Sequence, residues 1–253
     1  MLLPALLLMA APTPSISNAR LMATVRHLST AYPTRNTSTP ECRAAAEWVA
    51  GELRKIPGLQ VELMTYHVEA GRRVPKALDV VQVVATLPGE TTRRVMIGGH
   101  LDTIQLNQDP MTALAPGAND DASGVAATME TARVFAARAA AGMKPKNTMV
   151  FVAFTGEEQG LFGSTALAER AVKEGWTIDA LLSNDTIGGG QGANGERDKG
   201  TVRIYSEESE THLGRELARL IEWETRGKIR GFRPRLVFRR DRFQRGGDHT
   251  PFN

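Results

Sequence analysis

Strand-like runs alternate with helix-like segments along most of the chain. Residues 59–68 alternate apolar and polar side chains, which predicts a strand with one buried face. Residues 148–154 and 180–185 are short apolar runs, as expected of strands that are covered on both faces. Further strands are predicted at residues 78–87, 93–99 and 201–206.

Helical segments separate these strands. A helix is predicted over residues 40–56, because Thr39 suits an N-cap and Pro40 suits the first helical position. Other helices are predicted directly after Asp121, over residues 160–174 and over residues 209–225. The alternation indicates an α/β fold, with a single domain and one mixed, mostly parallel sheet sandwiched between helices.

Composition supports a globular protein. The chain has 253 residues, of which 42% are hydrophobic and 23% charged, and this excludes a disordered or fibrous chain. The formal net charge of +3 does not by itself point to nucleic acid. The single cysteine, Cys42, allows no disulfide within the chain, and we expect it to pack inside a helix.

Basic residues are concentrated between Arg226 and Arg245, where apolar residues interleave with them. Such a run could bind phosphate or an acidic partner, or it could be a solvated strand and loop. No aromatic stacking platform or nucleic-acid motif accompanies it, so we expect no nucleic-acid partner.

The N-terminus carries a short apolar run, residues 2–11, followed by small residues and prolines. This pattern is typical of a secretory signal peptide, although no Lys or Arg precedes the run. An amphipathic or buried first helix is the alternative. We interpret residues 1–15 as a signal peptide and 16–253 as the mature domain, secreted or periplasmic and without a membrane span.

Acids and histidines gather in five short stretches, four of which lie at strand ends or helix starts. These stretches are GGHLDT, GANDDASG, TGEEQG, SNDTIGG and RGGDHTPF. In an open parallel sheet, the carboxyl ends of the strands share one edge, where ligands bind. Taken singly, each stretch has a structural explanation; Asp120 and Asp121, for example, could cap the helix that follows them.

Taken together, the stretches favour a metal centre. Several carboxylates at one sheet edge would repel one another and would be costly to desolvate. Divalent cations remove that cost, and mixed histidine and carboxylate ligands suit zinc. Because the donors outnumber the ligands of one tetrahedral ion, the sequence predicts two metals that share a bridging carboxylate.

The motifs H-x-D, G-A-N-D-D-x-S-G, G-E-E-x-G-x-x-G-S, N-D-x-I-G and D-H-x-P-F occur in this order. Over roughly residues 40–253, the chain resembles the co-catalytic dizinc aminopeptidases, a family of secreted bacterial leucyl aminopeptidases related to glutamate carboxypeptidases and glutaminyl cyclases. The resemblance implies that Asp120 bridges two zinc ions. It also implies that His100 and Asp185 complete one site, and that Glu158 and His249 complete the other.

The resemblance assigns other roles to three further residues. Glu157 would be the general base, taking a proton from the metal-bound water and passing it to the leaving amine. Asp102 would accept a hydrogen bond from the second ring nitrogen of His100 and so fix its tautomer. A cis peptide bond is implied between Asp120 and Asp121, and Asp121 remains the candidate helix cap.

The implied activity is that of a zinc exopeptidase, a hydrolase that removes the N-terminal residue of peptides with a free N-terminus. A carboxypeptidase is an alternative, because the arginines of residues 239–245 could bind a substrate carboxylate. A single-zinc glutaminyl cyclase and a non-catalytic relative are further alternatives. A non-catalytic relative should lack some of the metal ligands or the general base, but this sequence has all of these residues. Since the chain stops four residues after His249, we expect that a C-terminal strand and helix of the family are missing. The sequence leaves the oligomeric state open.

Overall fold

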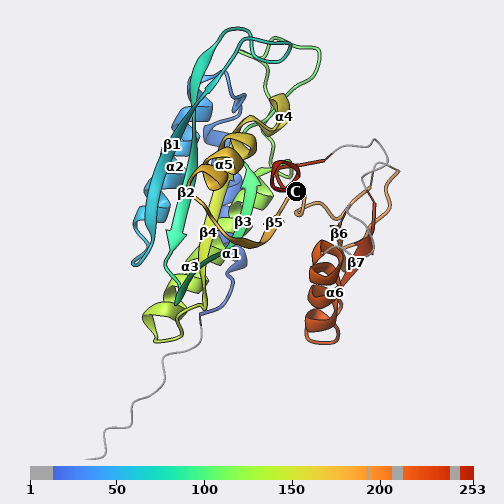
Figure 1. Ribbon diagram of the computed structural model, residues 1–253. Coiled ribbons are helices and arrows are strands. Elements are labelled where there is room, and N and C mark those ends of the chain that lie inside the picture. Colours follow the sequence, from blue (N-terminus) through green and yellow to red (C-terminus); the bar gives the residue numbers. More distant parts are fainter. Residues whose placement is uncertain (1–13, 193, 207–212, 240–245) are drawn as a thin grey trace, which may run out of the picture.

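The computed structural model describes residues 14–192, 194–206, 213–239 and 246–253 (Figure 1). Two segments discussed above lie outside the described residues: the apolar run of the predicted signal peptide, residues 2–11, and residues 240–245 of the basic run. Within the described part of the chain, no helix combines the length and the apolar character needed to cross a membrane.

A five-stranded mixed sheet forms the centre of the fold. Its strands, in spatial order, are β1 (Gln60–Val68), β2 (Leu78–Leu87), β4 (Asn147–Phe154), β3 (Thr91–His100) and β5 (Ile178–Ser183). β1, β2 and β4 pair antiparallel, whereas β4, β3 and β5 pair parallel. The mixed sheet is confirmed, but it is not mostly parallel: two of its strand pairings are antiparallel and two are parallel, and the parallel part carries the candidate chemistry.

Helices cover both faces of this sheet, as predicted (Figure 1). On one face lie α1 (Asn18–Ala31), α2 (Pro40–Arg54) and α3 (Ala122–Ala140). On the other face α5 (Phe162–Lys173) follows the short helix α4 (Glu157–Gly160). The C-terminal 3₁₀ turn η1 (Thr250–Phe252) packs against α5.

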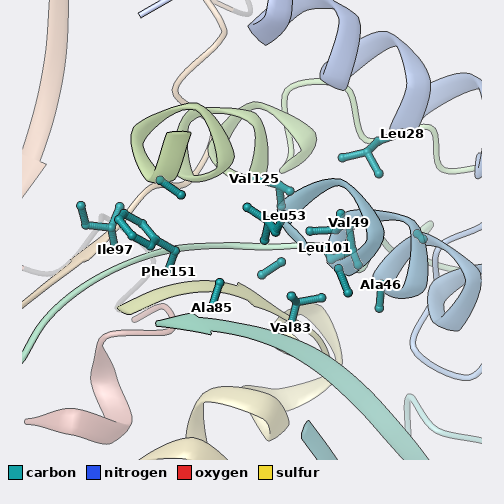
Figure 2. Close-up of a cluster of buried hydrophobic side chains, with 14 of the residues drawn as sticks. Leu28, Ala46, Val49, Leu53, Val83, Ala85, Ile97, Leu101, Val125 and Phe151 are labelled. Carbon is teal, nitrogen blue, oxygen red and sulfur yellow. The ribbon is translucent and has the colours of Figure 1, made fainter. Parts of the chain in front are cut away.

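The strand sequences explain the two hydrophobic cores. Val83 and Phe151 point to the α1–α3 face (Figure 2), while Val84 and Val152 point to the α5 face. Because successive side chains of a strand alternate between faces, only strands apolar at every position can fill both cores. This is why β2 and β4 read as continuous apolar runs.

Local signals set the helix starts. Thr39 caps α2 by accepting a hydrogen bond from the backbone N–H of Cys42, which is buried as expected. The patterns did not predict α1, whose Ser17 cap is its clearest start signal.

The expectation of one sheet for the whole chain is wrong. β6 (Thr201–Tyr205) pairs parallel with β7 (Arg233–Val237) in a separate two-stranded sheet, and α6 (Leu213–Thr225) packs on β7. The strand expected to be buried at 180–185 is also only half-buried, because within the described residues β5 pairs on one edge alone. The apolar sequence of β5 does not indicate whether a further strand pairs with its second edge.

Candidate metal centre

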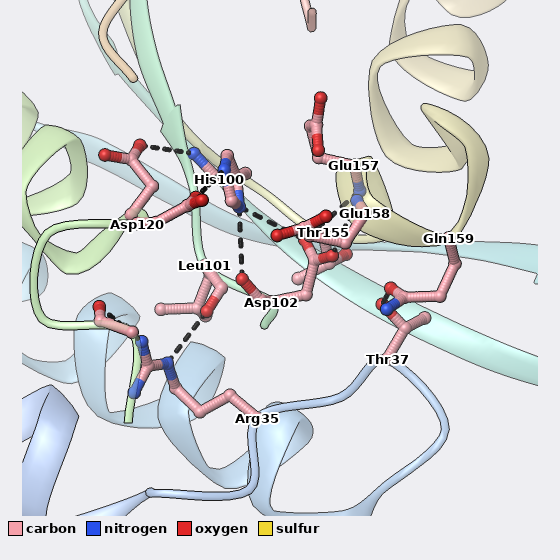
Figure 3. Close-up of polar contacts among 12 residues, drawn as sticks. Arg35, Thr37, His100, Leu101, Asp102, Asp120, Thr155, Glu157, Glu158 and Gln159 are labelled. Carbon is pink, nitrogen blue, oxygen red and sulfur yellow. Dashed lines mark hydrogen bonds and ion pairs between the residues drawn. The ribbon is translucent and has the colours of Figure 1, made fainter. Parts of the chain in front are cut away.

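The topology brings the candidate residues to one edge of the sheet. His100 ends β3, Glu157 and Glu158 begin α4 directly after β4, and Asp185 follows β5. Asp120 lies just before α3, in a turn beside His100 (Figure 3). The parallel strands β3, β4 and β5 therefore place their carboxyl ends together, as the sequence predicted.

Three candidate ligands form a compact group. Nε2 of His100 lies 3.0 Å from Oδ1 of Asp120 and 3.9 Å from Oδ1 of Asp185. Among the described residues, these side chains form the one group of three or more whose potential ligand atoms all lie within 4.8 Å of one another. His100 is 2% exposed, whereas the two carboxylates are about half exposed. A buried imidazole thus faces two oxygens that remain accessible from outside.

The charge state of His100 reflects these neighbours. Burial opposes protonation of the ring, but the hydrogen bond to Asp120 and the charges of Asp102 and Asp121 outweigh it. Together they hold the pKa of His100 well above its usual value. The proton that Nε2 shares with Asp120 occupies the lone pair that a metal would need.

Asp102 acts through different atoms than expected. Its backbone carbonyl lies 3.1 Å from Nδ1 of His100, whereas its nearest carboxylate oxygen lies 4.0 Å away, too far for a hydrogen bond. The expectation that the Asp102 carboxylate binds the ring is therefore wrong. The backbone carbonyl accepts the Nδ1 proton and leaves Nε2 facing the acids.

The Asp102 carboxylate instead holds the start of α4. It accepts hydrogen bonds from the backbone N–H groups of Glu157 (3.2 Å) and Glu158 (3.0 Å). Helix α4 starts after Gly156, which has no side chain to cap it, so its first N–H groups need another acceptor. Asp102 supplies that acceptor and fixes the backbone of both glutamates.

Asp121 is the predicted cap of α3, and the structure adds a second role. Its carboxylate accepts from the N–H of Gly124 (2.9 Å), of His100 (3.1 Å) and of Thr186 (3.2 Å). The peptide bond between Asp120 and Asp121 is cis, which confirms the expectation. One buried carboxylate thus joins the three segments that carry His100, Asp120 and Asp185.

Three carboxylic acids of the site have pKa values above their usual range. Burial, followed by the charge of Asp102, raises the pKa of Glu157 to about 8, although His100 opposes this shift. Burial and then the charge of Asp120 raise the pKa of Glu158 to about 7. The buried Asp248 also has its pKa raised to about 7, mainly by burial. Raised pKa values mean that a nearby positive charge would stabilise the ionised forms of these acids, so the donor set fits a divalent cation.

The compact group contains three of the five predicted ligands. Glu158, in the first turn of α4, and His249, half-buried before η1, are both described, but neither belongs to the compact group. Of the arginine cluster at residues 239–245, only Arg239 is described. The roles of Glu158 and His249 as ligands stay predictions.

Sequence reasoning missed Arg35, which is fully buried beside the turn that leads to Asp120 (Figure 3). Hydropathy patterns assign an arginine in a loop to the surface, so no sequence signal marked it. Thr37, two residues later, was missed for the same reason; its hydroxyl hydrogen-bonds the side chain of Gln159 in α4.

Comparison with known proteins identifies the family. The sequence model described as "Peptidase family M28" matches residues 82–252, which is more than half of the chain and includes every candidate residue from His100 to His249. The chain belongs to peptidase family M28. A curated relative, a "Probable zinc metalloprotease" of Leptosphaeria maculans, is 35% identical over 86% of this chain and 55% of its own length. The chain thus spans about half the length of the curated relatives that it matches.

Solved structures share the fold of this chain. A leucine aminopeptidase precursor from Bacteroides thetaiotaomicron superposes with a TM-score of 0.72 and 17% identity, over 95% of this chain and 82% of its own. A glutaminyl cyclase from Porphyromonas gingivalis superposes with a TM-score of 0.73 and 21% identity, over 94% and 80% of the two chains. At such identities the likeness establishes the fold alone, which is the helix-flanked mixed sheet described above.

Proposed function

We propose that this M28 chain is the catalytic part of a zinc exopeptidase that hydrolyses the N-terminal peptide bond of peptides, with two zinc ions per chain. The observation that carries the proposal is the placement of His100 Nε2 against Asp120 and Asp185 at the sheet edge. The naming of a 35%-identical relative as a probable zinc metalloprotease supports the metal and the reaction class. Export of the mature protein stays a prediction.

His100, Asp120 and Asp185 would hold one zinc ion, and Asp120, Glu158 and His249 the other. When bound, zinc supplies a Lewis acid that polarises a carbonyl and lowers the pKa of water. Oxygen and imidazole donors of this kind are typical zinc ligands. The raised pKa values of Glu158 and Asp248 support the need for positive charge at this place.

Glu157 would move the proton. Asp102 fixes its backbone through the N–H group, so the carboxyl can remain free while the neighbouring Glu158 binds metal. With a pKa of about 8, the Glu157 carboxyl is mostly protonated at pH 7 in the metal-free protein, and a nearby cation shifts it toward the ionised form. Such a group can accept a proton from water and return it to a leaving amine.

Metal analysis and a small substrate panel test the proposal. Full-length protein, purified without chelators, should contain about two zinc ions per chain, since the five predicted ligands would serve two ions that share Asp120. It should cleave an aminoacyl-anilide and lose this activity with chelator. Less than one zinc per chain would count against the metal assignment.

Two other substrates separate the alternatives. Cleavage of an N-blocked dipeptide in preference to the anilide would favour a carboxypeptidase. Conversion of an N-terminal glutaminyl peptide into its pyroglutamyl form with release of ammonia, without hydrolysis of the anilide, would favour a cyclase.

A further inference from the structure

Arg35 lies in the loop between α1 and α2 and is 0% exposed. Its guanidinium donates only to backbone carbonyls of the described residues. The recorded acceptors are Leu28 (2.7 Å), Tyr32 (3.0 Å), Leu101 (2.8 Å), Pro116 (3.0 Å) and Gly117 (3.2 Å). A planar fork with five N–H donors is suited to join several chain segments in this way.

Two of these segments carry candidate ligands. Leu101 is the residue between His100 and Asp102, and Figure 3 shows its carbonyl facing the guanidinium. Pro116 and Gly117 open the turn that leads to Asp120. The remaining acceptors lie at the end of α1. Arg35 therefore ties both ligand segments to the helical layer behind them.

The loop around Arg35 repeats this connection through other groups. The carbonyl of Arg35 accepts from the N–H of Thr103 (2.9 Å), and the carbonyl of Pro33 accepts from Ala115 (2.8 Å). The hydroxyl of Thr37 donates to the side chain of Gln159 in α4. Residues 33–37 thus contact the segment after β3, the segment before α3 and the helix of Glu157 and Glu158.

The turn fits closely against the guanidinium. Gly117 has a positive φ of 53°, and a Cβ atom there would overlap Thr103 and the carbonyl of Asp120 and would lie 2.9 Å from Nη2 of Arg35. Only glycine tolerates both the backbone conformation and the contact. The turn that leads to Asp120 therefore lies in close contact with the guanidinium, which donates to the carbonyl of Gly117.

The charge of Arg35 is preserved despite its burial. Burial lowers the pKa of the guanidinium to about 10, while the nearby carboxylates of Asp102 and Asp121 oppose the shift when they are ionised. The group remains a cation at neutral pH. An unpaired buried cation would be costly, and the five carbonyl contacts offset that cost.

We propose that Arg35 is a positioning residue of the M28 metal centre. It holds the Asp120 turn and the His100–Asp102 segment in fixed positions relative to each other and thereby sets the affinity for zinc. Within the described part of the chain, the guanidinium donates to backbone carbonyls of the ligand-bearing segments and not to the side chains of His100, Asp120 or Asp185. The inference rests on the proposed zinc function, and its test includes the wild-type protein so that the two can fail separately.

The test measures zinc affinity by competition with a chromophoric chelator, alongside thermal melting of the zinc-free protein. Arg35→Lys keeps the charge but replaces the fork by a single ammonium, and Arg35→Ala removes both. We expect both variants to bind zinc on the order of 10–100-fold more weakly than wild type, the usual effect of removing a group that orients metal ligands. Arg133→Ala is the matched control, because Arg133 binds Glu130 and the carbonyl of Ser15 far from the ligands. It should melt earlier and keep the wild-type affinity.

Chemical rescue separates positioning from general stability. Methylguanidinium at low millimolar concentration should restore part of the zinc affinity of Arg35→Ala and leave wild type and Arg133→Ala unchanged. Wild-type protein that binds no zinc would overturn the proposed function and this inference with it. If wild type binds zinc and Arg35→Lys binds it equally well, the inference alone is overturned. It is also overturned if Arg35→Ala loses affinity only in proportion to its melting temperature and methylguanidinium restores none. Should Arg35→Ala fail to fold, Arg35→Lys decides.

Discussion

Nδ1 of His100 lies 3.1 Å from the backbone carbonyl of Asp102 and 4.0 Å from the carboxylate of the same residue. The main chain therefore sets the tautomer of His100, and the Asp102 side chain is free to cap α4. One residue serves two neighbouring parts of the site through two different groups.

This division predicts how Asp102→Asn behaves. The amide keeps one oxygen acceptor but turns an NH₂ group toward the backbone N–H of Glu157 or Glu158. We expect the zinc content to stay at the wild-type level and kcat to fall about 10–100-fold, since Glu157 loses its support. Zinc analysis and steady-state kinetics check this. A variant that loses zinc while keeping its turnover per bound ion would instead indicate that the carboxylate orients the imidazole.

Glu157→Gln separates proton transfer from metal binding. The substitution preserves size and backbone contacts but removes the group that accepts the proton. We expect zinc content to be unchanged and kcat to fall about 10²–10⁴-fold, the usual contribution of a general base. Metal analysis and kinetics on the aminoacyl-anilide provide the measurement. An active variant would reject Glu157 as the base.

Zinc binding should release protons. The pKa of His100 is held well above its usual value, so the metal-free ring is protonated near neutral pH, and zinc must displace that proton. Affinity should therefore rise as pH increases from 6 toward 8, on the order of tenfold per pH unit for each proton released. Titration calorimetry in two buffers of different ionisation enthalpy counts the protons, and identical heats in both buffers would contradict the prediction.

Glu130 should contribute to stability in a defined pH range. It is 4% exposed on α3 and binds Arg20, Arg133 and the N–H of Ser17, which together hold its pKa at about 2 although burial opposes this shift. A lowered folded-state pKa means that the stability is fully present above about pH 4.5 and is lost as pH falls toward 2. Allowing for the half-exposed Arg20, we expect Glu130→Gln to lower the free energy of unfolding by about 2 kcal/mol at pH 7 and by much less at pH 2.5.

Urea unfolding at the two pH values measures this difference. Glu47→Gln is the control, because the Arg43–Glu47 pair is more than half exposed on both sides and should contribute little at either pH. An equal loss of stability for Glu130→Gln at both pH values would show that its contribution is packing and not charge.

Sequence patterns were sufficient for the elements that follow a simple period. The alternation over β1 and the apolar runs of β2 and β4 specified their strands, because each side chain of a strand faces one of two surfaces. The motif residues His100 and Asp185 could be placed at one sheet edge because parallel strands end on the same side.

The remaining features depend on contacts that no local pattern encodes. The backbone carbonyl of Asp102 hydrogen-bonds His100 and its carboxylate does not, although their distances to Nδ1 differ by less than 1 Å. No sequence pattern specifies so small a difference. The burial of Arg35 follows from carbonyls in three segments, two of which are distant in the sequence. The pairing of β6 with β7 depends on which strand edges are available, not on the composition of β6.

The three hydrogen bonds of the Asp121 carboxylate also constrain the order in which the protein acquires its structure. They join the end of β3, the start of α3 and the segment after β5, whose sequences span 87 positions from His100 to Thr186. None of these segments can hold its ligand in place until the others have docked. Competence to bind metal should therefore arise late and in a single step during folding, and the rate at which refolding chains capture zinc would report the completion of the parallel half of the sheet.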